Sequence, residues 1–159
     1  MSPTIRRGVR ILLVVDGLHT HELLGSVART APLAAAELWL VYVRGPGPRV
    51  GLDMVRHRPG RHALPPGRER DLNEAEVARG ANALEEAERL ALPLASEVRT
   101  VQLDGEAGRV VCDLARAQGI DLVAIRAGGR DQPPLGPQSV GPAARFIADH
   151  SPCPVLLIR

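Results

Sequence analysis

Short apolar runs alternate with amphipathic stretches along this chain, and this alternation limits the folds that it can adopt. Runs that are apolar at nearly every position are typical of parallel strands covered on both faces. The stretches between them carry apolar residues at helical spacing. We therefore predict an α/β domain in which strands and helices alternate. A length of 159 residues suits one such domain, 1–159, without a linker or a repeat.

Five strands and four helices are expected. The strands are Val9–Val15, Leu38–Val43, Glu97–Leu103, Ile120–Ile125 and Pro154–Ile158. The helices run from about Thr20 to Ala35, from Asp71 or Asn73 to Pro93, from Ala107 to Gln118 and from Pro142 to His150. The third strand alternates polar and apolar residues more than the others do, so we expect it at an edge of the sheet.

The segment 44–70 interrupts this pattern because it is rich in proline, glycine and arginine and has almost no apolar periodicity. Such a composition is typical of surface loops. We predict a mobile loop over 44–70. A solvated loop is favoured over a docking surface for an acidic partner or a nucleotide.

Composition excludes several classes of function. All 20 basic residues are arginine, so the chain lacks the lysine that a Walker A loop or a Schiff-base mechanism requires. Three aromatic residues and a net charge of +2 do not suit a nucleic-acid-binding protein. No apolar run approaches the roughly 20 residues of a membrane-spanning helix, and no signal segment opens the chain. A cytoplasmic protein without a membrane or nucleic-acid partner is expected.

Few residues suggest catalysis. His19 and His21 are two residues apart at a helix start, where side chains do not share a face, so we interpret them as exposed loop residues and not as metal ligands. Cys112 and Cys153 lack a CxxC spacing and are predicted to be buried free thiols. Ser139 lies in an incomplete nucleophile-elbow pattern. We therefore do not expect an enzyme, although the sequence leaves slow ATP hydrolysis open.

The candidate ligand site follows from the fold. Ligands of open parallel sheets bind outside the carboxyl ends of the strands, where the winding reverses. In this chain the rule indicates Asp16, Val43 and the segment 126–142. Asp16 has two interpretations: it contacts a ligand, or it only caps the turn that leaves the first strand.

Several motifs, taken in order, resemble the universal stress protein family. They are Ile-Leu-Leu-Val-Val-Asp-Gly at 11–17, Leu-Asp-Gly-Glu-Ala at 103–107, Asp-Leu-Val at 121–123, Ala-Gly-Gly-Arg at 127–130 and His-Ser-Pro-Cys-Pro-Val at 150–155. The resemblance implies one doubly wound domain of the adenine nucleotide alpha hydrolase-like type. Its five-stranded parallel sheet would have the order 3-2-1-4-5. It also implies a regulatory module, of which a subset binds ATP.

The resemblance further implies a nucleotide site. Its residues would be Val15, Asp16, Val43, Arg126, Gly128, Gly129, Arg130 and Gly141. The ligand would be ATP or another adenine nucleotide, with no metal beyond the magnesium that accompanies it. The chain departs from the family pattern, because Arg126 replaces a glycine and Pro142 replaces a serine or threonine, which removes a hydroxyl and an N–H group. Arg126 and Arg130 offer guanidinium groups for phosphate instead.

Two hypotheses therefore remain open. One is a nucleotide-binding regulatory module, and the other is a stress protein that acts without nucleotide, through homodimerisation and protein partners. Many family members dimerise through the last strand. Its residues here are Val155, Leu156, Leu157 and Ile158. An apolar strand at a sheet edge favours pairing with a second copy, so we predict a homodimer.

Overall fold

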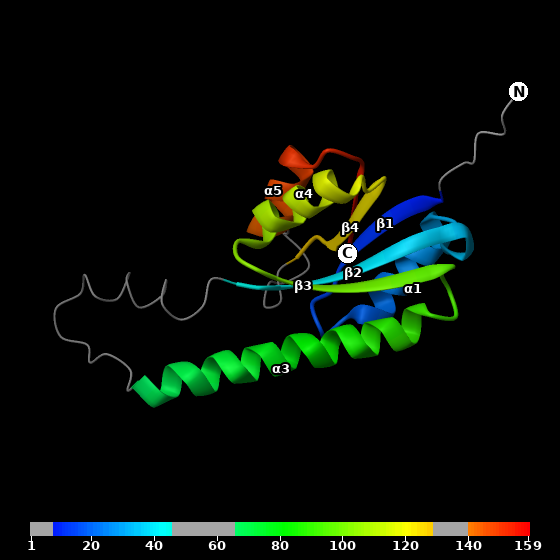
Figure 1. The fold of residues 1–159 in the computed structure, drawn as a ribbon. Helices are drawn as coiled ribbons and strands as arrows, with labels where there is room; N and C mark the ends of the chain where they lie inside the picture. Colours follow the sequence, from blue (N-terminus) through cyan, green and yellow to red (C-terminus); the bar gives the residue numbers. More distant parts are fainter. Residues whose placement is uncertain (1–7, 46–65, 129–139) are drawn as a thin grey trace, which may run out of the picture.

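A parallel sheet of five strands in the order β3-β2-β1-β4-β5 forms the centre of the computed structural model, which describes residues 8–45, 66–128 and 140–159 (Figure 1). The strands are β1 (Val9–Val14), β2 (Ala36–Arg44), β3 (Glu97–Asp104), β4 (Leu122–Arg126) and β5 (Val155–Ile158). Every neighbouring pair is parallel. The predicted fold class and strand order are confirmed, and β3 lies at an edge as expected.

Helices cover both faces of this sheet (Figure 1). They are α1 (Thr20–Thr30), α3 (Pro66–Ala91), α4 (Ala107–Gln118) and α5 (Pro142–His150), with a short 3-10 turn η1 at Leu33–Ala35. Because successive side chains of a strand point to opposite faces of the sheet, β1 contributes side chains to two hydrophobic clusters, one on each face. Leu13 packs in a cluster with residues of α1 and α3, and Leu12 packs in a cluster with residues of α4 and α5.

Two predicted helix bounds are wrong. The first helix ends at Thr30 and not at Ala35, because the backbone of Ala31 is extended and Pro32 lacks the N–H group that would continue the helix. The next long helix begins at Pro66, five residues before Asp71, so the predicted loop 44–70 is too long at its C-terminal end. Proline is well accepted in a first helical turn. The remainder of that loop, 46–65, lies outside the described residues.

The other bounds agree with the predicted ones to within one or two residues. Gly17 has a φ of +78°, which glycine adopts without strain, and it turns the chain sharply after β1. In the ranges that the structure describes, no helix is both long enough and apolar enough to cross a bilayer.

Candidate functional site

A cavity of about 210 Å³ lies at the carboxyl ends of β1, β2 and β4 and at the N-terminal ends of α4 and α5. Six of the predicted site residues line it together: Val15, Asp16, Val43, Arg126, Gly128 and Gly141. The other two, Gly129 and Arg130, lie outside the described residues. The cavity is therefore at the position where the winding of the sheet reverses, which is where α/β folds bind their ligands.

Asp16 caps the turn into α1 and also lines this cavity, so both of its interpretations agree with its position. Its Oδ1 atom accepts hydrogen bonds from the backbone N–H groups of Leu18 and His19, each at 2.9 Å. Burial alone would raise the pKa of the Asp16 carboxyl, but the hydrogen bonds from His19 and Leu18 outweigh it and leave the pKa below its ordinary value. The carboxylate is therefore ionised at neutral pH.

Arg126 is the last residue of β4, and its guanidinium group lies beside Asp16 and His19. Its Nη1 atom is 2.8 Å from His19 Nδ1 and 3.8 Å from Asp16 Oδ2. Asp16 Oδ2 is itself 3.0 Å from His19 Nδ1. The interpretation of His19 as an exposed loop residue is therefore wrong. Its side chain is only 28% exposed and belongs to this cluster.

The role of His19 was not predicted, because His19 and His21 were considered only as metal ligands near Asp16 and were rejected on their two-residue spacing. The contact with Arg126 joins residues 107 positions apart and depends on the pairing of β1 with β4. The one local signal was the three-residue spacing between Asp16 and His19. For residues 8–45, 66–128 and 140–159, no group of three or more histidine, cysteine, aspartate or glutamate side chains has the arrangement of a metal site.

The start of α5 offers fewer amide donors to an anion than most helices do. The Gly141 N–H group donates to the carbonyl oxygen of Ala127 at 2.7 Å, and Pro142 has no N–H group. The first helical hydrogen bond of α5 is donated by Arg145 to Gly141. The amides of Ala143 and Ala144, which both line the cavity, are therefore the remaining donors of this first turn.

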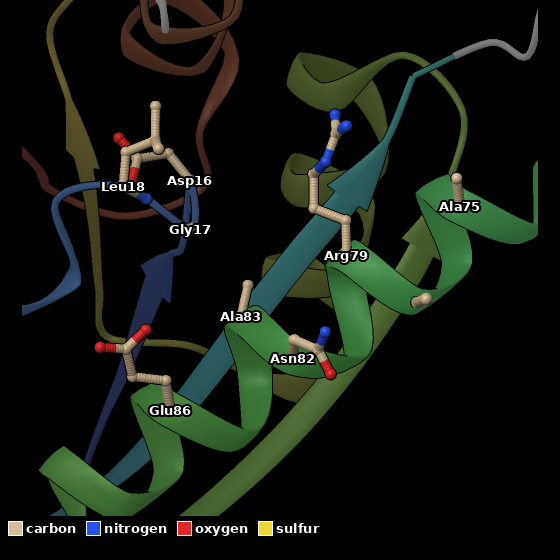
Figure 2. Close-up of a pocket in the computed structure, with 9 residues that line it drawn as sticks. Asp16, Gly17, Leu18, Ala75, Arg79, Asn82, Ala83 and Glu86 are labelled. Carbon is tan, nitrogen blue, oxygen red and sulfur yellow. Dashed lines mark hydrogen bonds between the residues drawn. The ribbon is translucent and has the colours of Figure 1, made fainter. Parts of the chain in front are cut away.

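A second, larger cavity of about 540 Å³ lies between the 16–18 turn and α3. Figure 2 shows the turn on one side and the helix on the other, with Glu86 extending toward the turn. Alanines at 75, 78 and 83 make room for this cavity, and Arg79, Asn82 and Glu86 supply its polar groups. Asp16 lines both cavities. This second cavity was not predicted from the sequence.

The two cysteines are free thiols, as predicted. Cys112 is buried in α4, and burial raises the pKa of its thiol above the ordinary value. A thiol of raised pKa is a poor nucleophile at neutral pH. Cys153 is only partly buried, so its predicted burial is wrong. It lies in the turn between α5 and β5, where Ser151 Oγ is 3.5 Å from its sulfur.

An open parallel sheet with a crevice at its carboxyl edge defines the class of doubly wound α/β proteins. The sequence profile of the Universal stress protein family matches residues 9–159, and the chain therefore belongs to that family. No curated protein sequence matches the chain significantly.

Solved structures of the same family share the fold. The universal stress protein UspA from Lactobacillus plantarum is 23% identical, with a TM-score of 0.68 over 96% of this chain and 99% of its own. A universal stress protein from Archaeoglobus fulgidus in complex with dAMP is 17% identical, with a TM-score of 0.63 over 95% of this chain and 98% of its own. A family member from Arabidopsis thaliana with AMP bound is 15% identical, with a TM-score of 0.60 over 94% of this chain and 90% of its own.

Proposed function

We propose that this protein is a cytoplasmic regulatory module that binds an adenine nucleotide in the 210 Å³ cavity and does not turn it over. One observation carries the proposal. Six residues chosen from the sequence, which come from strands β2 and β4 and from the segments that follow β1 and β4, line a single cavity at the carboxyl edge of the sheet. The nucleotides in the solved structures from Archaeoglobus fulgidus and Arabidopsis thaliana support it at the level of the fold.

The chemistry of the cavity suits the parts of a nucleotide. Val15 and Val43 offer apolar surface for a base, and the ionised carboxylate of Asp16 can accept hydrogen bonds from ribose hydroxyls. Arg126 and the amides of Ala143 and Ala144 can donate to phosphate oxygens. In the described residues of the cavity, these three are the main phosphate donors.

We further propose that the preferred ligand carries one phosphate group. The Gly141 amide is already bonded to Ala127, and Pro142 has no amide hydrogen to donate. The volume of about 210 Å³ is also below the roughly 300–1,000 Å³ of most small-molecule pockets. Among the described residues that line the cavity, a triphosphate chain would find fewer donors for its charge than AMP would, so AMP is expected to bind at least as tightly as ATP.

Calorimetric titration of AMP, ADP and ATP tests this proposal, together with mass spectrometry of denatured protein for a co-purified nucleotide. Ala143→Leu fills the cavity from the partly buried first turn of α5 and is expected to weaken AMP binding at least about tenfold, because the added side chain occupies the volume of the ligand. Asp16→Ala is expected to abolish binding.

The matched control is Ala148→Leu, because Ala148 is exposed on the same helix and does not line the cavity. This variant should bind AMP as the wild type does. Undiminished binding by Ala143→Leu, or the absence of both heat and co-purified nucleotide at millimolar AMP, would contradict the proposal.

The exposed edge of the sheet favours a second candidate function, a stress protein that acts through homodimerisation and protein partners. β5 pairs with β4 on one side, and its other edge has no neighbouring strand among the described elements. Leu157 is 36% exposed, and Val155 and Leu156 are only partly buried. We propose that this apolar edge pairs with a second copy of the chain, because an edge strand without a partner exposes hydrogen-bonding groups.

The substitution Leu157→Arg tests the dimer. It places a charge on the proposed interface and is expected to convert a dimer to a monomer in sedimentation velocity at micromolar concentration. Val9→Arg is the control, because Val9 is similarly exposed but lies at the start of the central strand β1. A wild-type protein that sediments as a monomer at every concentration would argue against the dimer.

A further inference from the structure

The Nδ1 atom of His19 lies within hydrogen-bond distance of two groups, one that can only donate a hydrogen bond and one that can only accept it. Arg126 Nη1 is 2.8 Å away and can only donate a hydrogen bond. Asp16 Oδ2 is 3.0 Å away and, as a carboxylate oxygen, can only accept one. A ring nitrogen carries either a lone pair or a hydrogen, so it satisfies one of these partners at a time.

A neutral ring with its hydrogen on Nδ1 would donate to Asp16 without a change of charge, but its hydrogen would then face the donor Arg126 Nη1 at 2.8 Å. We therefore consider the two other arrangements of the cluster. When Nδ1 carries a lone pair, it accepts from Arg126 and keeps the guanidinium group close to the Asp16 carboxylate, where the three side chains together are neutral. When Nδ1 carries a hydrogen on a charged imidazolium, it donates to Asp16, and the charged ring repels Arg126 at 2.8 Å. The cluster then has a net charge of +1, which favours movement of Arg126 away from His19.

We propose that His19 is a positioning residue for Arg126: unprotonated His19 holds the guanidinium group beside Asp16, and protonated His19 binds Asp16 and releases Arg126 into the 210 Å³ cavity to meet an anionic group. Arg126 already lines that cavity, so its release requires a side-chain rotation and no movement of β4. The part of this inference that concerns a ligand rests on the proposed nucleotide function. The exchange of partners within the cluster does not.

The surroundings of His19 allow this assignment. In the described part of the chain, Asp16 faces the ring from the β1–α1 turn and Arg126 faces it from β4. The first turn of α1, which follows His19 directly, carries one further charged side chain, Glu22, and this side chain is exposed. His21 is also exposed, and no hydrogen bond to its ring is found among the described residues, so it provides a matched control. Histidine is the side chain whose charge ordinarily changes between pH 5 and pH 8.

A nuclear magnetic resonance titration of the ligand-free protein from pH 8 to pH 5.5 tests the exchange directly. The ring nitrogens of His19 and the side-chain Nε–H signal of Arg126 are followed together. We expect the neutral ring to carry its hydrogen on Nε2, and the Arg126 signal to shift with the same midpoint as the protonation of His19. His19→Asn keeps a polar atom near the position of Nδ1 but does not titrate, so it should remove the pH dependence of Arg126. His21→Asn should leave it unchanged.

Two results would overturn the proposal: an Arg126 signal that does not respond while His19 titrates, or a neutral His19 that carries its hydrogen on Nδ1. Because both are measured without a ligand, the role of His19 is decided whether or not a nucleotide binds. A merely structural role of His19 would not tie the Arg126 signal to the protonation of the ring.

Calorimetry with AMP then measures the consequence for the ligand. The wild type is expected to bind AMP about tenfold more tightly at pH 5.5 than at pH 8, beyond any change seen in His19→Asn, because ligand binding and protonation of His19 favour the same arrangement. The comparison with His19→Asn is needed because the AMP phosphate itself titrates near pH 6. If AMP binds neither protein, the proposed nucleotide function fails, and the resonance titration alone decides the role of His19. If AMP binds both with the same pH dependence, the coupling of His19 to the ligand is refuted.

Discussion

Replacing Leu13 by alanine is expected to lower the free energy of unfolding by about 3–5 kcal/mol. Leu13 is fully buried in the central strand, where it lies opposite Leu40 of β2 and Ala124 of β4. Its side chain belongs to the core beneath α1 and α3. Alanine would remove apolar contacts on every side of this position, and the two flanking strands prevent the sheet from closing around the space.

Val9→Ala is the control for Leu13→Ala. Val9 begins the same strand but is 40% exposed, so the loss should stay below about 1 kcal/mol. Urea denaturation followed by circular dichroism measures both variants, with the slope of the unfolding curve as a check on two-state behaviour. Equal losses at the two positions would mean that β1 is not the centre of the core.

Replacing Gly108 by alanine is expected to destabilise the protein by about 1–3 kcal/mol, although alanine is the better helix former. Gly108 lies in the first turn of α4, against Phe146 of α5. A Cβ atom added there would be 2.7 Å from the Cβ atom of Phe146, a distance that side chains essentially never adopt. Because the Cβ of Phe146 is fixed to the backbone of α5, relief requires a shift of the helix. The first turn of α5 lines the cavity, so AMP binding should weaken as well.

The substitution Gly25→Ala should stabilise the protein, in contrast to Gly108→Ala. Gly25 lies within α1, and the nearest atom to an added Cβ is the flexible guanidinium end of Arg29 at 3.5 Å. This substitution is expected to raise the free energy of unfolding by about 0.5–1 kcal/mol, because alanine restricts the unfolded chain and favours the helix. The same urea titration measures it. If both alanine variants change stability in the same direction, the close approach of α4 and α5 at Gly108 does not control stability.

Local chemistry explains which elements of the fold the sequence could predict. The nearly continuous apolar run of β1 and the helical spacing of α4 depend only on neighbours along the chain, and both elements were predicted to within one residue. The start of α3 could not be predicted in this way. Proline and glycine at Pro66 and Gly67 usually mark a loop, but the first turn of a helix also accepts proline, and the choice between the two depends on how the rest of the helix packs.

In the candidate site, too, the features that depend on position along the chain could be predicted, and those that depend on packing could not. Asp16, Val43 and Arg126 follow or end strands, so the rule for parallel sheets brings them to one edge without knowledge of side-chain contacts. The place of His19 depends on the direction of its ring toward Arg126, which neither the spacing along the chain nor the predicted strand order encodes. The cavity between α3 and the 16–18 turn depends on the distance between the helix and the turn, where three small alanine side chains leave space. The order of residues along the chain does not specify that distance.

Asp16 is shared by two cavities, one bounded by α3 and the other by the N-terminal ends of α4 and α5. A molecule in one cavity that displaces this carboxylate would also change the wall of the other cavity. Any such influence is reciprocal: the factor by which the first occupant changes the affinity for the second equals the factor by which the second changes the affinity for the first. One aspartate side chain is thus part of the wall of both cavities, and a displacement of it would change the shape of both.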